Sequence, residues 1–252
     1  MGRYTSLPTL NFDFIKPGRM SFDSKGAGLE GGRNGLGESV TIETTGGGVF
    51  VATFENCYAQ APEEHEYLNW VAARMNGSFR FMNVPVVSDW MGPFPFLDRV
   101  TPQPIISGIP HSDGALFSDD SGYSQATVFG TIGADAPLNA GQITLNIFGA
   151  TRNLRWSDWF SILHPTKGWR IYRYWEASDP VDVTVVVEGV SVSGSQYVLS
   201  LERPLREAVT SGDRVEFARP RCVCKFPVGF TLPWDAQGFM RSSPTFQFVE
   251  AF

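Results

Sequence analysis

The alternation of hydrophobic and polar residues predicts a chain built mainly from β-strands. Seven segments between residues 126 and 219 are rich in β-branched and aromatic residues and recur at a spacing of about 8–12 residues. They are ATVFGTI, QITLNIFG, WFSILH, WRIYRYWEA, VDVTVVVEGV, QYVLSLE and DRVEFAR. Short strands at this spacing are typical of a small barrel or sandwich. The pattern predicts an all-β barrel domain over residues 121–227.

One segment, residues 62–76, has the period of an α-helix, with the sequence PEEHEYLNWVAARMN. Proline suits the first turn of a helix, and the glutamates that follow suit its positive end. Asn76-Gly77 is expected to end it. The apolar residues recur at i, i+3, i+4 and i+7 and form one stripe: Leu68, Val71, Ala72 and Met75.

Strand patterns surround this helix. SVTIET and VFVATFENCYA flank the triple glycine at residues 46–48, which predicts a β-hairpin. SFRFMNVPV follows the helix, and TFQFVEAF ends the chain with another strand pattern. A helix packed on an antiparallel sheet follows from this order. We predict a mainly β, β-rich α+β fold: an antiparallel β-sandwich-like domain over 1–120, completed by 228–252, with the barrel inserted between.

Two stretches lack a period. Residues 17–38 are dominated by Gly and polar residues, so we expect a long loop or an arm that becomes ordered on a partner, and neither a strand nor a helix. Residues 85–110 are rich in proline, which removes backbone donors, so a regular central strand is not expected there.

Composition narrows the class of protein. Charged residues make up 18% of the chain, against about 25% in an average soluble domain. The net charge of -6 argues against a nucleic-acid binder. Lys is scarce beside Arg, which is typical of protein interfaces, although a host of high genomic GC content explains the same bias. The chain contains no signal-peptide pattern and no apolar run of spanning length, so neither Sec export nor membrane insertion is expected.

The histidines, His65, His111 and His164, have no metal-ligand spacing. We interpret His65 as a solvated helix residue and His164 as a turn residue. The loop HSDGALFSDD could gather His111, Asp113, Asp119 and Asp120 around a cation or as acid and base, but a solvated loop tip is the default interpretation.

Three cysteines, Cys57, Cys222 and Cys224, do not form a disulfide framework. The i, i+2 spacing of Cys222 and Cys224 places both thiols on one face of a strand. Two thiols are half of a zinc site, and burial as small hydrophobic residues is the favoured interpretation.

Aromatic residues gather between residues 156 and 175. Alternation places Trp169, Ile171 and Arg173 on one strand face and Arg170, Tyr172 and Tyr174 on the other, with one face in the core. Exposed rings on a barrel can stack on sugars, which makes a carbohydrate-binding module the alternative function; core packing and subunit contact are the other interpretations. The candidate residues for sugar or subunit contact are Trp156, Trp159, Trp169 and Tyr172.

Catalytic motifs do not appear in the sequence. It has no GxSxG elbow, and no cysteine has a His nearby. We therefore expect no enzyme, no catalytic residue, no cofactor and no metal. A hydrolase of envelope glycans that uses Asp119 and Asp120 is the third hypothesis.

Three stretches resemble a known family: YLNWVAARMNGSFRFMNVP, LERPLREAVTSGDRVEFARPRCVCKF and the terminal SSPTFQFVEAF. Their shared pattern is a hydrophobic helix, a polar turn and a strand, then a proline-rich span, then a barrel ending in PLR-x-A-x-x-x-G-D-x-V-x-F-x-x-P. This resembles the distal tail protein and related minor tail proteins of long-tailed bacteriophages.

The resemblance implies a structural protein of the virion tail tip, assembled in the host cytoplasm. It implies a homo-oligomeric ring, commonly a hexamer, in which residues 1–120 and 228–252 form the ring domain. The implied partners are the tail tube, hub and tape measure proteins, together with tail fibres or host surface glycans. A closed ring requires two different patches on each subunit.

Overall fold

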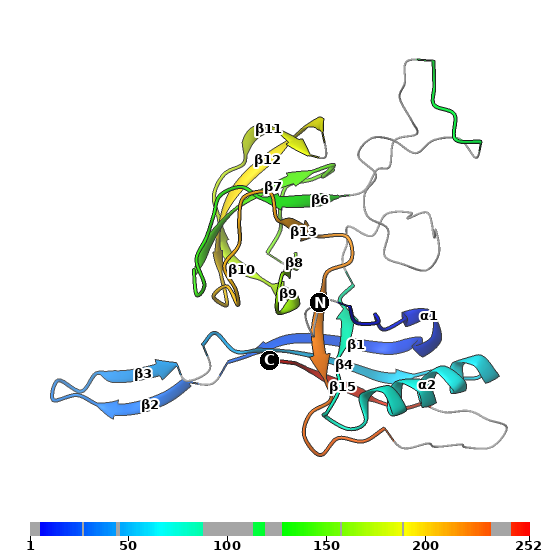
Figure 1. The fold of residues 1–252 in the computed structure, drawn as a ribbon. Helices are drawn as coiled ribbons and strands as arrows, with labels where there is room; N and C mark the ends of the chain where they lie inside the picture. The colour runs from blue at the N-terminus through cyan, green and yellow to red at the C-terminus, as the bar shows by residue number, and fades with distance from the viewer. Residues whose placement is uncertain are drawn as a thin grey trace. The chain divides into compact units, whose positions relative to one another are not determined.

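The computed structural model describes residues 6–26, 28–43, 46–87, 113–118, 128–156, 158–187, 189–232 and 243–252. These residues form mostly β-strands in antiparallel sheets, with two helices, which confirms the predicted fold class (Figure 1). The chain divides into two compact units. The first comprises Met1–Pro85, Pro165–Arg170 and Arg221–Phe252, and the second Val86–His164 and Ile171–Pro220.

The first unit is built on a five-stranded antiparallel sheet. Its strands lie in the order β1 (Pro17–Lys25), β4 (Val49–Cys57), β15 (Phe246–Glu250), β14 (Arg221–Lys225) and β5 (Met82–Pro85). The phenylalanines of β4 and β15 are fully buried, and Phe54 and Phe248 pack edge to face across the two strands with ring centres 6.0 Å apart. The chain's last strand pattern thus completes the first sheet.

The predicted barrel boundary at residue 227 is wrong. β14 pairs with β5 and β15 and belongs to the sheet of the first unit. The i, i+2 spacing of Cys222 and Cys224 suits a strand, but it contains no information about which distant strand supplies the hydrogen-bond partners.

The predicted helix is confirmed as α2 (Pro62–Met75), alongside a short α1 (Phe12–Ile15). Leu68, Val71 and Met75 of its stripe are buried, and Ala72 is half-buried. Glu64 lies at the third helical position and accepts hydrogen bonds from the backbone N–H of Gln60 at 2.7 Å and of Ala61 at 3.0 Å. Ala61 at the N-cap has no side chain that could accept a hydrogen bond, so Glu64 supplies the half of a capping box that accepts from the N–H of the N-cap residue.

The glycine-rich region is not a loop, which corrects the sequence prediction. Residues 17–25 form β1, which pairs with β4 along its whole length, and β2 (Gly28–Arg33) follows. Glycine does not prevent a strand when a long partner strand supplies the hydrogen bonds, and here β4 does so.

The predicted hairpin around the triple glycine is also wrong. β3 (Ser39–Glu43) pairs with β2, whereas β4 pairs with β1 and β15. The turn lies instead at residues 34–38, where the side chain of Asn34 accepts hydrogen bonds from the N–H of Leu36 and of Glu38. Gly46, Gly47 and Gly48 all have positive φ and join β3 to β4.

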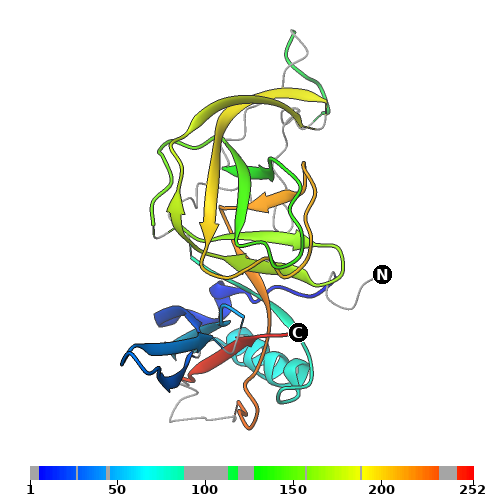
Figure 2. The same ribbon diagram turned by 90° about the vertical axis from the view of Figure 1, so that its left-hand side faces the viewer.

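The second unit contains a curled antiparallel sheet (Figure 2). Its strand order is β10 (Tyr174–Ala177), β12 (Val190–Leu201), β7 (Gln142–Phe148), β6 (Phe129–Ile132), β13 (Arg214–Glu216), β8 (Phe160–His164) and β9 (Gly168–Tyr172), and β11 (Val181–Val187) also pairs with β12. Each of the seven predicted strand segments overlaps at least one of these strands. The core of the unit includes Ile132, Leu145, Leu199 and Phe217.

Candidate functional site

The four aromatic candidates do not share a surface. Trp156 is 82% exposed. Trp159 is half-buried, and the guanidinium of Arg173 lies 5.1 Å from the centre of its ring. Arg173 is held in turn by Glu202 through two hydrogen bonds of 2.8 and 2.5 Å. Of Trp156 and Trp159, only Trp156 has a ring that is open to solvent.

Trp169 and Tyr172 are buried, so neither ring is a surface platform, and this part of the prediction is corrected. Trp169 is covered by the guanidinium of Arg221 at 4.4 Å from its ring centre. The hydroxyl of Tyr172 accepts a hydrogen bond from the N–H of Arg206 at 3.0 Å and lies 2.8 Å from Nε2 of His164. Every residue of β9 is buried, because both faces of this strand are covered rather than one.

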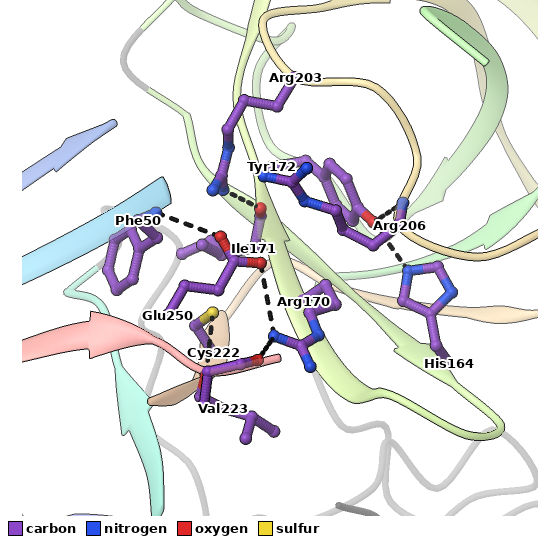
Figure 3. A network of polar contacts seen from close by, with 11 residues as sticks. Phe50, His164, Arg170, Ile171, Tyr172, Arg203, Arg206, Cys222, Val223 and Glu250 are labelled. Atoms are coloured by element: carbon purple, nitrogen blue, oxygen red, sulfur yellow. Dashed lines mark hydrogen bonds and ion pairs between the residues drawn. The ribbon is translucent and has the colours of Figure 1, made fainter. Parts of the chain in front are cut away.

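Two of the histidines are buried, contrary to the sequence interpretation. His65 is 5% exposed on α2, and His164 is fully buried within β8 rather than in a turn. Its ring forms the contact with Tyr172 described above (Figure 3). A histidine ring can be buried in a core when a partner forms hydrogen bonds with its nitrogen atoms. A single sequence does not show which residue is that partner.

A second cluster of polar contacts is centred on Glu250, near the end of β15 (Figure 3). Its carboxylate accepts a hydrogen bond from the N–H of Phe50 at 3.1 Å and lies 3.4 Å from Nη1 of Arg170. Arg170 also donates to the backbone carbonyl of Ala251 and lies over the ring of Phe252. Because both charged side chains are completely buried, this arrangement holds the end of the chain and offers no access to a substrate.

The cysteines are buried thiols, as the sequence predicted. Cys57, Cys222 and Cys224 are all free and at most 1% exposed. Burial raises the pKa of Cys57 to about 12, and burial together with the adjacent Cys222 raises the pKa of Cys224 well above its usual value. A thiol that stays protonated is a poor nucleophile and a poor metal ligand.

No group of three His, Cys, Asp or Glu side chains suited to a metal ion occurs in the part of the chain that the structure describes. Of the candidate loop at 111–120, Asp113 is described and is exposed, and it accepts a hydrogen bond from the N–H of Ala115. His111, Asp119 and Asp120 lie outside the described residues, as does most of the proline-rich segment. The described helices include none that is long and apolar enough to cross a membrane.

The most distinctive surface is the β2–β3 ribbon, residues 28–43. Its two strands pair only with each other in the described structure, and every residue of β2 is exposed. Leu29 and Ile42 are Cα partners across the ribbon and are 63% and 55% exposed, while Leu36 in the turn is 86% exposed. An isolated two-stranded ribbon is marginally stable in water. The sequence predicted a loop or an arm over residues 17–38 and did not predict this ribbon.

No protein-family model matches the chain, and no curated protein is significantly similar to it.

Proposed function

We propose that this chain is a structural subunit of a bacteriophage tail tip that forms a ring between the tail tube and the hub. The tail tube, hub and tape measure proteins are its partners, and tail fibres or host surface glycans lie beyond them. The three stretches that carry the family resemblance support this proposal. They contain the C-terminal part of α2 with β5, β13 with β14, and β15, and the strands β5, β14 and β15 are neighbours in one sheet. Segments far apart in sequence therefore contribute to one structural element.

The exposed β2–β3 ribbon is the observation that carries the proposal. It exposes Leu29, Leu36 and Ile42, and a ribbon of two strands gains stability when a third surface covers its apolar side chains. A ring needs one patch on each subunit that fits a different patch on the next. The ribbon supplies the first patch, and a second copy of the chain supplies the other.

The experiment is light scattering after size-exclusion chromatography of the purified full chain, together with electron microscopy of the particles. We expect a closed ring for the wild type and loss of the ring for the Leu29→Asp/Ile42→Asp variant, because two carboxylates on the covered face cannot be desolvated without cost. Val228→Asp is the control, since Val228 is 88% exposed in the same unit but outside the ribbon.

Two results would contradict the proposal. A wild-type chain that stays monomeric at high concentration and is absent from tail tips is not a ring subunit. If the ribbon variant forms the same ring as the Val228→Asp control, the ribbon is not part of the subunit interface.

A further inference from the structure

A groove of about 610 Å³ lies in the second unit. This size is within the range of about 300–1,000 Å³ typical of small-molecule sites. Its walls come from β6, β7, β13 and the β11–β12 pair, so all of its described residues belong to one unit. None of the sequence candidates lies in it.

One wall of the groove is a row of polar side chains across four strands. Arg214, Thr131, Asn146 and Gln196 are successive Cα partners on β13, β6, β7 and β12, so their side chains share one face of the sheet. Thr131 is 6% and Asn146 4% exposed. The row is polar although the opposite face of the same strands forms the apolar core.

Three side chains of this row form a chain of hydrogen bonds in which each donates to the next. Gln196 Nε2 donates to Asn146 Oδ1 at 2.8 Å, and Asn146 Nδ2 donates to Thr131 Oγ1 at 3.3 Å. No described residue donates to Oε1 of Gln196 or accepts from the hydroxyl of Thr131. The hydrogen-bonded chain of Gln196, Asn146 and Thr131 therefore offers an acceptor on Gln196 and a donor on Thr131.

The other wall is apolar. Val183, Val185 and Val187 alternate along β11 and line the groove from one strand face, and Val186 borders it from the other face. β7 ends opposite Gly194, and beyond this point β11 and β12 continue as a pair that arches over the unit (Figure 2). A Cβ at Gly194 would collide with the backbone oxygen of Ile147, so this approach requires glycine.

The groove is electrically neutral among its described residues. Arg214 is the one ionisable side chain in its described lining, and Glu216 neutralises it through a hydrogen bond of 2.8 Å. An anionic ligand would find no free positive charge here. The site suits an uncharged ligand with polar groups on one side and C–H groups on the other.

We propose that this groove binds a neutral saccharide. Sugar hydroxyls both donate and accept, which matches the Gln196 acceptor and the Thr131 donor, and the C–H faces of a sugar ring match the valines of β11. A peptide strand is recognised mainly through a free backbone edge. β6 and β7 have neighbours on both sides, so their backbone groups are already hydrogen-bonded within the sheet. Among the described strands β11 pairs with β12 alone, and the peptide in the test below probes this edge. The proposal does not depend on the tail-tip function.

The test is calorimetric and NMR titration of the purified full chain with methyl glycosides of glucose, galactose, mannose and N-acetylglucosamine. At least one is expected to bind in the millimolar range or tighter. Gln196→Met removes the acceptor and Val185→Trp fills the groove, and each is expected to weaken binding about tenfold or more. The matched controls are Gln142→Met, exposed on β7, and Thr184→Trp, exposed next to Val185, and both are expected to bind as the wild type does.

Three outcomes overturn the proposal: no glycoside binds at about 20 mM; the groove variants bind as well as their controls; or a neutral tri-alanine peptide binds where the glycosides do not. Because two groove variants act in different ways, the misfolding of one leaves the other decisive. Ring formation is measured on the same variants and is expected to be unchanged, so failure of this proposal is distinct from failure of the tail-tip proposal.

Discussion

Arg170 and Glu250 form an ion pair in which neither side chain exposes any surface, with 3.4 Å between Nη1 and Oε1. Arg170 lies in β9 and Glu250 in the last strand, so the contact joins residues 80 positions apart. A buried charge is tolerated only when its partner and its hydrogen bonds are in place.

Removing one charge of this pair is expected to destabilise the protein strongly. Glu250→Gln should lower the free energy of unfolding by about 3–5 kcal/mol, because Arg170 is left as an uncompensated buried cation. The control is Glu55→Gln, since Glu55 pairs with Arg19 on the surface at 3.5 Å and such pairs contribute about 1 kcal/mol or less. Urea unfolding measures both, and equal losses would contradict a special role for the buried pair.

Glu64 is expected to make stability dependent on pH. The N–H of Gln60, the ammonium of Lys16 and the N–H of Ala61 lower its pKa from 4.5 to about 2. A lowered folded-state pKa means that the stabilisation is fully present above pH 4.5 and is lost as the pH falls toward 2.

The comparison is wild type against Glu64→Gln, unfolded in urea at a series of pH values. The wild type should be more stable at neutral pH, and the difference should shrink as the pH falls below 4.5. Glu66→Gln, at an exposed position on the same helix, is the control. A difference that does not change with pH would show that the lowered pKa is absent.

The buried stripe of α2 predicts a contrast between adjacent residues. Leu68→Asp places a carboxylate at a position that is 6% exposed and should cost roughly 3–5 kcal/mol through lost burial and desolvation. Asn69→Asp adds the same carboxylate one residue later, on the exposed face, and should change stability by less than about 0.5 kcal/mol. Thermal unfolding of the two variants would refute the helix orientation if they melt together.

Gly48 is expected to be less replaceable than Gly46. Both have positive φ, which costs a residue with a side chain about 1 kcal/mol or more. A Cβ at Gly48 would also meet the backbone of Lys25 and Gly26 at 2.7 Å, whereas none lies within 4 Å at Gly46. Gly48→Ala should therefore lower the unfolding free energy clearly more than Gly46→Ala does, by denaturant titration. If the two variants lose similar amounts of unfolding free energy, the backbone of β1 does not contact Gly48.

All three thiols are expected to resist modification in the folded protein. Cys57, Cys222 and Cys224 are buried, and burial raises the pKa of Cys57 and Cys224. A maleimide reagent followed by mass spectrometry should label none of them in buffer and all three in guanidinium chloride. Rapid labelling of native protein at Cys222 or Cys224 would show that β14 is accessible.

Local patterns were sufficient for α2 and for most of the strands of this fold. The stripe from Leu68 to Met75 predicted α2 because helical burial repeats within a few residues, and the alternation in segments such as QITLNIF predicted strands for the same reason. The burial of Cys222 and Cys224 also followed from spacing within one strand.

Predictions that needed a partner strand did not follow from local pattern. β3 and β4 flank three glycines and read as a hairpin, yet each pairs with a different strand. The local sequence predicts His164 in a turn. In the structure His164 is buried, because the hydroxyl of Tyr172 is a hydrogen-bond partner for its ring.

By itself, therefore, the sequence determined the mainly β class, the helix α2 and most of the strands, because these depend on periodicity over a few residues. Only the tertiary structure decided that Trp169 and Tyr172 are buried, that the glycine-rich region contributes β1 and part of the β2–β3 ribbon, and that Thr131, Asn146 and Gln196 form one row. The physical reason is that exposure and side-chain neighbours depend on strand register and sheet order, which join residues up to 200 positions apart.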